Sequence, residues 1–215
     1  MNIPENVISR KLKNVYFIIG GSCAGKTTAS KYLGEKYKMY RYSTDDMRKT
    51  YYEIADIEYQ PALYQDKIRG FSQIGIDEAI AREAAVICEL TPIIIADLIE
   101  LSGKYEKIIC EGVYAVGITP LVDYNRIIYL STSDEIIKRD FYSRPAQSHI
   151  MESTMKRTDM TDSEKEDWLN YRRNLACIYT KLDEFFKYDI KRYYRNENSI
   201  VEDMLNTIEQ HFGLT

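Results

Sequence analysis

Residues 20–28 of the chain, GGSCAGKTT, directly follow the apolar run VYFII and open the helical pattern TTASKYLGEKY. Gly20, Gly25, Lys26 and Thr27 match the pattern G-x-x-x-x-G-K-[ST]. The first glycine allows a sharp turn at the strand end, and the second allows the backbone to approach a ligand without a Cβ atom. Successive N–H groups then face inward and, with the N-terminus of the helix, form an anion site. The segment therefore predicts a strand, a phosphate-binding loop and a helix.

The loop residues divide by role. We expect Lys26 to reach the outer phosphates of a nucleotide and the hydroxyl of Thr27 to bind Mg²⁺. The stretch does not spell G-x-G-x-x-G, which disfavours a dinucleotide site, and an ordinary strand-to-helix turn is the alternative. ATP and Mg²⁺ are thus the predicted cofactors. The residues expected to contact the nucleotide here are Gly20, Gly21, Ser22, Cys23, Ala24, Gly25, Lys26, Thr27 and Thr28.

Five short apolar runs predict β-strands. They are Val15–Ile19, Met39–Ser43, Lys107–Cys110, Arg126–Leu130 and Tyr188–Tyr194. Helical patterns separate these runs, and strands that alternate with helices indicate an α/β fold with a parallel sheet covered on both faces. The runs VYFII, KIIC and RIIYL show little alternation of apolar and polar residues, as expected for strands buried on both sides.

Helix boundaries can be read from capping patterns. Residues 132–135, 161–164 and 199–202 each fit a capping box, and a last helix is expected from Val201 to Phe212, ended by Gly213. The long segment between the second and third strands repeats apolar residues at helical spacing. Pro92 is expected to kink or break that helix, with IIIADLIEL as a second segment.

Composition excludes several classes of protein. The chain has 215 residues, which suits one domain, and its net charge is −4. A nucleic-acid or membrane-surface binder is usually basic, so neither nucleic acid nor membrane is an expected partner. The chain has two histidines and four cysteines without a C-x-x-C pair, so a zinc site is not expected. The first residues do not form the apolar segment of a signal peptide, and no apolar stretch reaches membrane-spanning length, so we expect a cytoplasmic protein with reduced thiols.

Four features, taken in order, resemble small-molecule kinases of the nucleoside-monophosphate-kinase and shikimate-kinase type. They are GGSCAGKT, STDD at 43–46, IICEG at 108–112 and RIIYLSTSDEIIKRDFYSR at 126–144. The resemblance implies a three-layer P-loop NTPase fold, with a five-stranded parallel sheet in the order 2-3-1-4-5 flanked by helices. It also implies a single kinase domain over residues 1–215, with an acceptor-binding helical segment at about 45–103 and an arginine-bearing lid at about 139–165. The implied activity is ATP-dependent phosphoryl transfer to a small molecule.

Acidic residues follow the second predicted strand. Asp45 and Asp46 lie at its carboxyl end, where ligands bind in open α/β sheets. Either can orient and deprotonate an acceptor hydroxyl, and Asp45 can instead hold Mg²⁺ through water. Arg48, one helical turn on, is a candidate to bind an anionic group of the acceptor. The stretch S-T-D-x-M-R also resembles the acceptor region of archaeal-type 2-phosphoglycerate kinases, which favours a phosphorylated or carboxylated acceptor. The alternative is that both acids only cap the following helix.

Glu111 and Gly112 end the third predicted strand, where many members of the resembled family carry Asp-Gly. Glu111 is expected to extend toward Mg²⁺, water or the acceptor, although its longer side chain leaves direct metal ligation open. Gly112 would let the substrate approach the backbone. Both are therefore candidate substrate-binding residues.

The predicted lid carries three arginines, Arg139, Arg144 and Arg157. Arginine supplies fixed bidentate donors to the oxygens of a transferring phosphoryl group, so Arg139 and Arg144 are candidate catalytic residues and Arg157 a substrate-binding one. The polar segment SRPAQSHIMESTMKRTDM suits a lid that excludes water, and a solvated loop is the alternative. In the resembled kinases the loop after the fifth strand passes near the adenine, so Asn196 is a candidate base contact, although it equally suits a turn.

Tyrosines are numerous around the expected acceptor segment, and two interpretations stay open. They are either aromatic walls for a ring-bearing acceptor such as a nucleoside or packing residues. The residues in question are Tyr40, Tyr42, Tyr51, Tyr52, Tyr59 and Tyr64.

The activity has rival interpretations. A nucleotide-dependent regulatory switch would need no acceptor, so the acid after strand two and the arginine-rich lid argue against it. A toxin-type or antibiotic-modifying phosphotransferase would share the chemistry but need a larger pocket. Phosphorylation of nucleic-acid 5′ ends is disfavoured by the acidic pI of about 5.4. The expected partner is a small-molecule acceptor, and the chain is expected to be a monomer or a homodimer.

Overall fold

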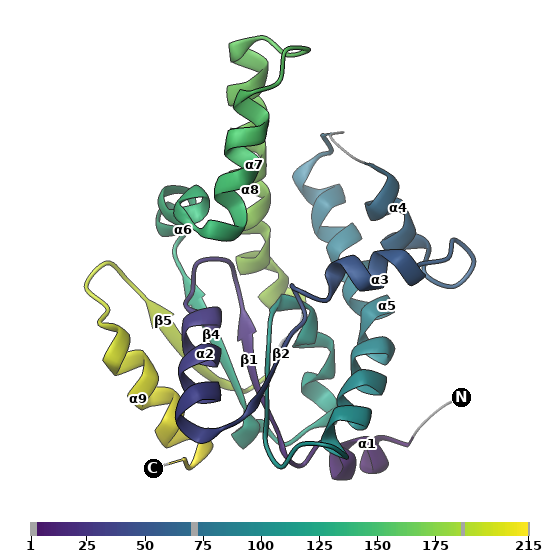
Figure 1. The fold of residues 1–215 in the computed structure, drawn as a ribbon, viewed down its shortest axis with the longest axis vertical. Coiled ribbons are helices and arrows are strands. Elements are labelled where there is room, and N and C mark those ends of the chain that lie inside the picture. Colours follow the sequence, from purple (N-terminus) through teal and green to yellow (C-terminus); the bar gives the residue numbers. More distant parts are fainter. Residues whose placement is uncertain (1–3, 70–72, 186–187, 215) are drawn as a thin grey trace.

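The computed structural model describes residues 4–69, 73–185 and 188–214. One or more helices separate successive strands along the chain (Figure 1). The elements are α1 (Glu5–Lys11), β1 (Val15–Gly20), α2 (Lys26–Tyr37), β2 (Tyr40–Ser43), α3 (Arg48–Ile54), α4 (Pro61–Arg69), α5 (Ile76–Ser102), β3 (Ile108–Glu111), β4 (Ile127–Thr132), α6 (Asp134–Asp140), α7 (Pro145–Met155), α8 (Asp162–Phe185), β5 (Lys191–Arg195) and α9 (Val201–Phe212). Three 3-10 helices, η1 (Val113–Leu121), η2 (Tyr124–Arg126) and η3 (Phe141–Ser143), complete them.

The five strands form one parallel sheet in the order β2-β3-β1-β4-β5. The predicted strand order 2-3-1-4-5 is confirmed. In the register of the sheet, Glu111 of β3 lies between Ile18 of β1 and Ser43 of β2. The loops that follow β1, β2 and β3 therefore leave the same edge of the sheet side by side, which is where ligands bind in such folds.

Apolar side chains cover both faces of the sheet. Phe17 and Ile19 of β1 point into a cluster with α5 and η1, whereas Ile18 points into a second cluster with α2 and α9. Figure 1 shows the corresponding layers, with α2 and α9 on one side of the sheet and α5 on the other. Burial on both faces explains why these strands show no apolar–polar alternation in sequence.

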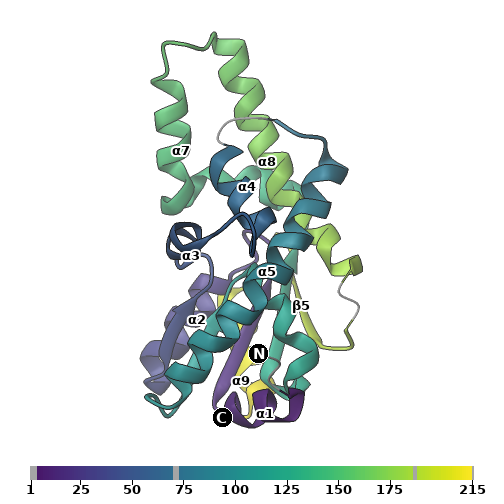
Figure 2. The same ribbon diagram turned by 90° about the vertical axis from the view of Figure 1, so that its right-hand side faces the viewer.

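Helices α7 and α8 form a hairpin that extends beyond the sheet, and α3 and α4 lie on the same side of the molecule (Figures 1 and 2). A third apolar cluster, which includes Phe141, Tyr142 and Leu169, joins α6 and η3 to α8. The segment predicted to be a polar lid is thus largely helical, with α7 packed along α8.

Pro92 was predicted to kink or break its helix. The predicted break is wrong, because α5 continues through Pro92 without interruption. Pro92 is exposed, so its ring meets solvent rather than core, while Leu90 and Ile94 beside it are fully buried. The loss of one backbone hydrogen bond is therefore offset by an apolar face that packs on both sides of the proline.

One of the three predicted capping boxes is confirmed. The backbone N–H of Thr161 donates to the Glu164 carboxylate at 2.7 Å, and the Glu164 N–H donates to the Thr161 hydroxyl at 3.3 Å. The other two predictions are wrong: Ser133 rather than Thr132 caps α6, because Thr132 still belongs to β4. At α9 the N-cap residue is Ile200, without a side-chain cap.

Candidate active site

The loop between β1 and α2 has the backbone conformation that its glycines predict. Gly20 has φ of 133°, and a Cβ atom there would lie 1.9 Å from the carbonyl oxygen of Leu130 on the neighbouring strand. Only glycine fits at this point, so the turn out of β1 is set by its sequence. Cys23 also has positive φ, and α2 begins at Lys26 immediately after Gly25. The N-terminus of α2 therefore faces the space enclosed by the loop.

Lys26 is held over this loop. Its Nζ donates to the carbonyl oxygen of Gly21 at 2.7 Å, and the residue is only 7% exposed. Burial lowers the pKa of Lys26, while the nearby carboxylates of Asp45 and Glu111 act in the opposite direction. A buried ammonium group with a single backbone acceptor is well placed to gain phosphate oxygens as partners.

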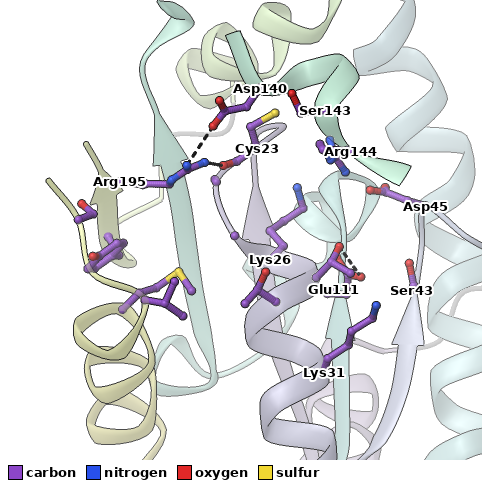
Figure 3. Close-up of a pocket in the computed structure, with 18 of the residues that line it drawn as sticks. Cys23, Lys26, Lys31, Ser43, Asp45, Glu111, Asp140, Ser143, Arg144 and Arg195 are labelled. Carbon is purple, nitrogen blue, oxygen red and sulfur yellow. Dashed lines mark hydrogen bonds and ion pairs between the residues drawn. The ribbon is translucent and has the colours of Figure 1, made fainter. Parts of the chain in front are cut away.

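A cavity of about 970 Å³ opens over the loop (Figure 3). In Figure 3, Arg195 and Cys23 lie on one side of it, Asp45 and Arg144 on the other, and Lys26 between them. Its volume is at the upper end of the range for small-molecule sites. Residues that line it beyond the loop include Lys31, Arg41, Ser43, Asp45, Asp46, Glu111, Asp140, Ser143, Arg144, Gln147, Tyr193, Arg195, Ile200, Val201 and Met204.

Glu111 is buried at the floor of this cavity. The Thr27 hydroxyl donates to its Oε1 at 3.2 Å, and Arg41 Nη2 lies 3.5 Å from the same atom. The other oxygen, Oε2, is buried and has no hydrogen-bond partner among the described residues. Burial raises the pKa of Glu111, with Lys26 acting against it. An unpartnered carboxylate oxygen beside a loop threonine fits a hydrated Mg²⁺, which prefers few protein ligands besides water and phosphate.

No cluster of three or more His, Cys, Asp or Glu suited to a metal occurs in the part of the chain that the structure describes.

The two predicted acids after β2 are placed differently. Asp45 is exposed and lines both this cavity and a second one, whereas Asp46 lines only the first. Asp46 accepts a hydrogen bond from Arg41 at 3.4 Å, and its backbone N–H donates to the Ser43 hydroxyl at 3.2 Å. Asp45 therefore lies where the two cavities meet, whereas Asp46 is paired with Arg41.

The second cavity, of about 300 Å³, lies beside the first and is enclosed by residues of α3, α4, α5, η1 and α8. Arg48, the candidate acceptor-binding residue, lines this cavity and is hydrogen-bonded to Tyr52 and Asp66. Four residues line both cavities and so mark the place where they meet. These are Lys26, Asp45, Arg144 and Gln147.

Six predicted site residues line neither cavity: Gly20, Gly21, Gly112, Arg139, Arg157 and Asn196. Arg139, at the exposed end of α6, pairs with Asp140 and Glu197. Arg157 pairs with Asp159 in the turn between α7 and α8.

Asn196 belongs to a turn instead. Its N–H donates to the Ser199 hydroxyl at 2.9 Å, and its side-chain oxygen accepts from the N–H of Asn198. Gly20, Gly21 and Gly112 shape the loops without lining either cavity themselves.

Arg195 is a site residue that the sequence analysis missed. Its guanidinium donates to the Cys23 carbonyl oxygen at 2.5 Å and to Asp140 at 3.0 Å, which ties the phosphate-binding loop to β5 and to the end of α6. Its position at the carboxyl end of β5 was the available signal. Arg41 was missed because it lies within the second predicted strand, before the strand end at which ligands were expected.

The tyrosines near the acceptor segment line neither cavity. Tyr42 and Tyr51 are buried and hydrogen-bonded to each other, and the Tyr42 hydroxyl donates to Asp97 at 2.6 Å. Tyr40 stacks on Tyr105 with ring centroids 4.0 Å apart. These contacts support the packing interpretation over aromatic walls for a ring-bearing acceptor.

No family model matches the chain, and no curated protein matches its sequence. The solved structures that match in fold include a shikimate kinase from Acinetobacter baumannii in complex with shikimate (17% identity; 96% of each chain covered; TM-score 0.42). A deoxyadenosine kinase from M. mycoides with its products dCMP and dCDP bound also matches (14% identity; 94% of this chain and 100% of that chain; TM-score 0.46). The strand order β2-β3-β1-β4-β5 and the glycine-rich loop after β1 give the chain a P-loop fold. No described helix of this P-loop protein is long and apolar enough to cross a membrane.

Proposed function

We propose that the chain is a P-loop kinase that transfers the γ-phosphoryl group of ATP to a small-molecule acceptor. The observation that carries this proposal is the meeting of two cavities at Lys26, Asp45 and Arg144. The larger cavity opens on the phosphate-binding loop, and the smaller one is enclosed by helices outside it. A regulatory switch would need only the first, so the second cavity favours a transferase.

The nucleotide would occupy the larger cavity. The loop N–H groups and Lys26 would hold the β- and γ-phosphates, with the base toward the apolar residues Ile200, Val201 and Met204. Thr27 and Glu111 are the residues that would hold Mg²⁺, with Asp45 able to contribute through water. When bound, Mg²⁺ neutralises charge on the phosphate oxygens.

The transfer step needs an acceptor hydroxyl beside Asp45. Its oxygen forms a new bond to the γ-phosphorus while the bond from that phosphorus to the ADP oxygen breaks, and the hydroxyl proton passes to the Asp45 carboxylate. Arg144 lies at the junction and would stabilise the charge on the transferring group. Arg139 and Arg157 would reach the transferring phosphoryl group only if their segments moved. Asp46 would orient Arg41, to which it is hydrogen-bonded.

All four cysteines are free thiols, and Cys110 and Cys177 are buried. Reduced thiols are the rule in the cytosol, which supports a cytoplasmic location for this kinase.

The test is ADP release from Mg-ATP against a panel of nucleosides, nucleotides, sugar acids and hydroxy acids. We expect release that depends on an acceptor in the native protein and is abolished in Lys26→Ala. Lys138→Ala removes an exposed lysine that lines neither cavity and should match the native protein. Release that ignores every acceptor would support the switch instead, and full activity of Lys26→Ala would overturn the proposal.

A further inference from the structure

The smaller cavity is rich in arginine. Five basic residues line it against three acidic ones, although the chain as a whole carries a net charge of −4. The basic residues are Lys26, Arg48, Arg82, Arg144 and Arg172, and the acidic residues are Asp45, Asp66 and Glu83. The local excess of positive charge is therefore opposite in sign to the whole protein, and it favours an anionic ligand.

The inner carboxylates satisfy only part of this charge. Asp66 is hydrogen-bonded to Arg48 and to Tyr52, so it is committed to the α3 side of the cavity. Arg82 Nε lies 3.6 Å from Asp66, and Arg82 Nη2 lies 3.5 Å from Glu83. Both distances exceed those of a good charge-assisted hydrogen bond. Arg82 Nε is in fact buried without a hydrogen-bond partner among the described residues.

Glu83 is the second acidic residue near Arg82, and it is buried. It is only 3% exposed, and burial raises the pKa of its carboxyl group even with Arg48 and Arg82 nearby. The Tyr179 hydroxyl is 3.4 Å from Glu83 Oε2 and is its main neutral partner. The long Arg82–Glu83 separation and the unpartnered Arg82 Nε leave this guanidinium able to accept a further anionic partner.

A second unpartnered Nε–H group comes from Arg172 on α8. Its guanidinium lies over the ring of Trp168, with the central carbon 5.9 Å from the ring centroid, and Trp168 is itself buried. The aromatic ring supports the planar group without offering a hydrogen-bond acceptor in its plane. Arg172 Nε is buried, has no hydrogen-bond partner, and forms no ion pair within the described residues. Two buried N–H donors that line one cavity therefore lack acceptors, which is unusual in a folded protein.

We propose that the smaller cavity takes an acceptor bearing an oxyanion group, a carboxylate or a phosphate, which Arg82 and Arg172 hold while a hydroxyl faces Asp45. This rests on the proposed kinase activity and names its substrate class. The cavity volume of about 300 Å³ is at the low end of the range for small-molecule sites, so the acceptor is compact, such as a hydroxy acid, a sugar acid or a sugar phosphate. Neutral sugars and nucleosides would bring no negative charge to the unpartnered Nε–H groups of Arg82 and Arg172.

The test uses sets of related acceptors in which one member is neutral and the others carry a carboxylate or a phosphate. Glycerol, D-glycerate and glycerol 3-phosphate form one set, and sorbitol, D-gluconate and glucose 6-phosphate form another. We expect kcat/KM for Mg-ATP-dependent turnover of an acid or a phosphate to exceed that of its neutral partner by about 10–100-fold, the value of a charge-assisted contact. The carboxylate and phosphate arms identify which oxyanion the site prefers.

Variants of Arg172 test whether this residue is responsible for the preference for charged acceptors. Arg172→Gln should raise KM for the charged acceptor by about 10–100-fold with a smaller change in kcat, and Arg172→Lys should restore part of the loss. Arg173→Gln is the matched control, because Arg173 is the next residue on α8, is bonded to Asn170 and does not line the cavity.

Equal use of neutral and charged acceptors, no use of any charged member, or an Arg172→Gln protein with native KM would each overturn the proposal. Lys26-dependent turnover of neutral acceptors would overturn it while leaving the kinase assignment intact. No Lys26-dependent use of ATP with any acceptor would overturn both.

Discussion

Glu111→Gln is expected to stabilise the protein in the absence of nucleotide while removing activity. Glu111 is 1% exposed, and its Oε2 has no hydrogen-bond partner among the described residues. A buried polar group without a partner costs about 1–3 kcal/mol of stability, and more when it is charged. The contacts of the other oxygen with Thr27 and Arg41 offset part of this cost. We therefore expect Glu111→Gln to gain about 1 kcal/mol, or about 2–4 °C in Tm for a chain of this size.

The gain should depend on pH in a defined direction. Burial raises the pKa of Glu111 in the folded protein above its usual value of 4.5. The folded state then binds this proton more tightly than the unfolded state, so the native protein is favoured below pH 4.5 and loses stability as pH rises through the folded-state pKa. Glutamine does not ionise, so the variant escapes that loss. The advantage of Glu111→Gln should be small near pH 4.5 and largest at neutral and alkaline pH.

The assay is thermal unfolding of both proteins across this pH range, without nucleotide and then with Mg-ATP. Mg-ATP should stabilise the native protein more than the variant, because Glu111 is one of the residues proposed to hold Mg²⁺. Glu111→Asn, which shortens the side chain, separates loss of charge from loss of packing. The reasoning is refuted if Glu111→Gln is less stable than the native protein at alkaline pH, or if the difference does not change with pH.

Three further outcomes are expected. Gly112→Ala should destabilise the protein by about 2–4 kcal/mol, measured by urea unfolding. The reason is that Gly112 has φ of 132° and the new Cβ would lie 2.0 Å from the Thr44 hydroxyl oxygen. A variant as stable as the native protein would contradict this. Arg144→Gln should lower kcat by ~10³-fold, whereas Arg139→Gln should stay within about twofold of native; steady-state kinetics that rank the two in reverse would show that the lid moves. Asp97→Ala should cost about 1–3 kcal/mol of stability without changing kcat, because Asp97 accepts a buried tyrosine hydroxyl; a loss of kcat in the folded variant would give it a role in the site.

Much of the fold follows from local sequence. The strand runs are apolar on both faces and are separated by helical patterns, so the expected runs overlap β1 to β5 and the sheet order agrees. The predictions for Pro92 and for the capping box at residues 199–202 were wrong because each considered only local sequence, whereas contacts elsewhere in the fold decided the outcome. In α5 the packed apolar face outweighs the proline, and before α9 the Ser199 hydroxyl is already used by the Asn196 turn.

The site likewise contains some residues that local sequence predicted and others that it could not predict. The phosphate-binding loop is continuous in sequence, so its residues could be identified together, and Asp45 and Glu111 follow from their places at strand ends. Arg82 and Arg172 could not be identified, because they lie on α5 and α8, far apart in sequence. On a long helix, which arginine faces a cavity depends on how the helices pack against each other.

The most direct test of the account is to follow the γ-phosphoryl group itself. Native protein and Asp45→Asn are incubated with γ-labelled Mg-ATP and a mixture of small hydroxylated compounds, and labelled products are separated from inorganic phosphate. The account predicts label in an organic phosphate ester formed by the native protein and at least about 10²-fold less in Asp45→Asn, the scale of general-base catalysis. Label found only in ATP and inorganic phosphate would contradict the central claim that the two cavities meet to transfer a phosphoryl group.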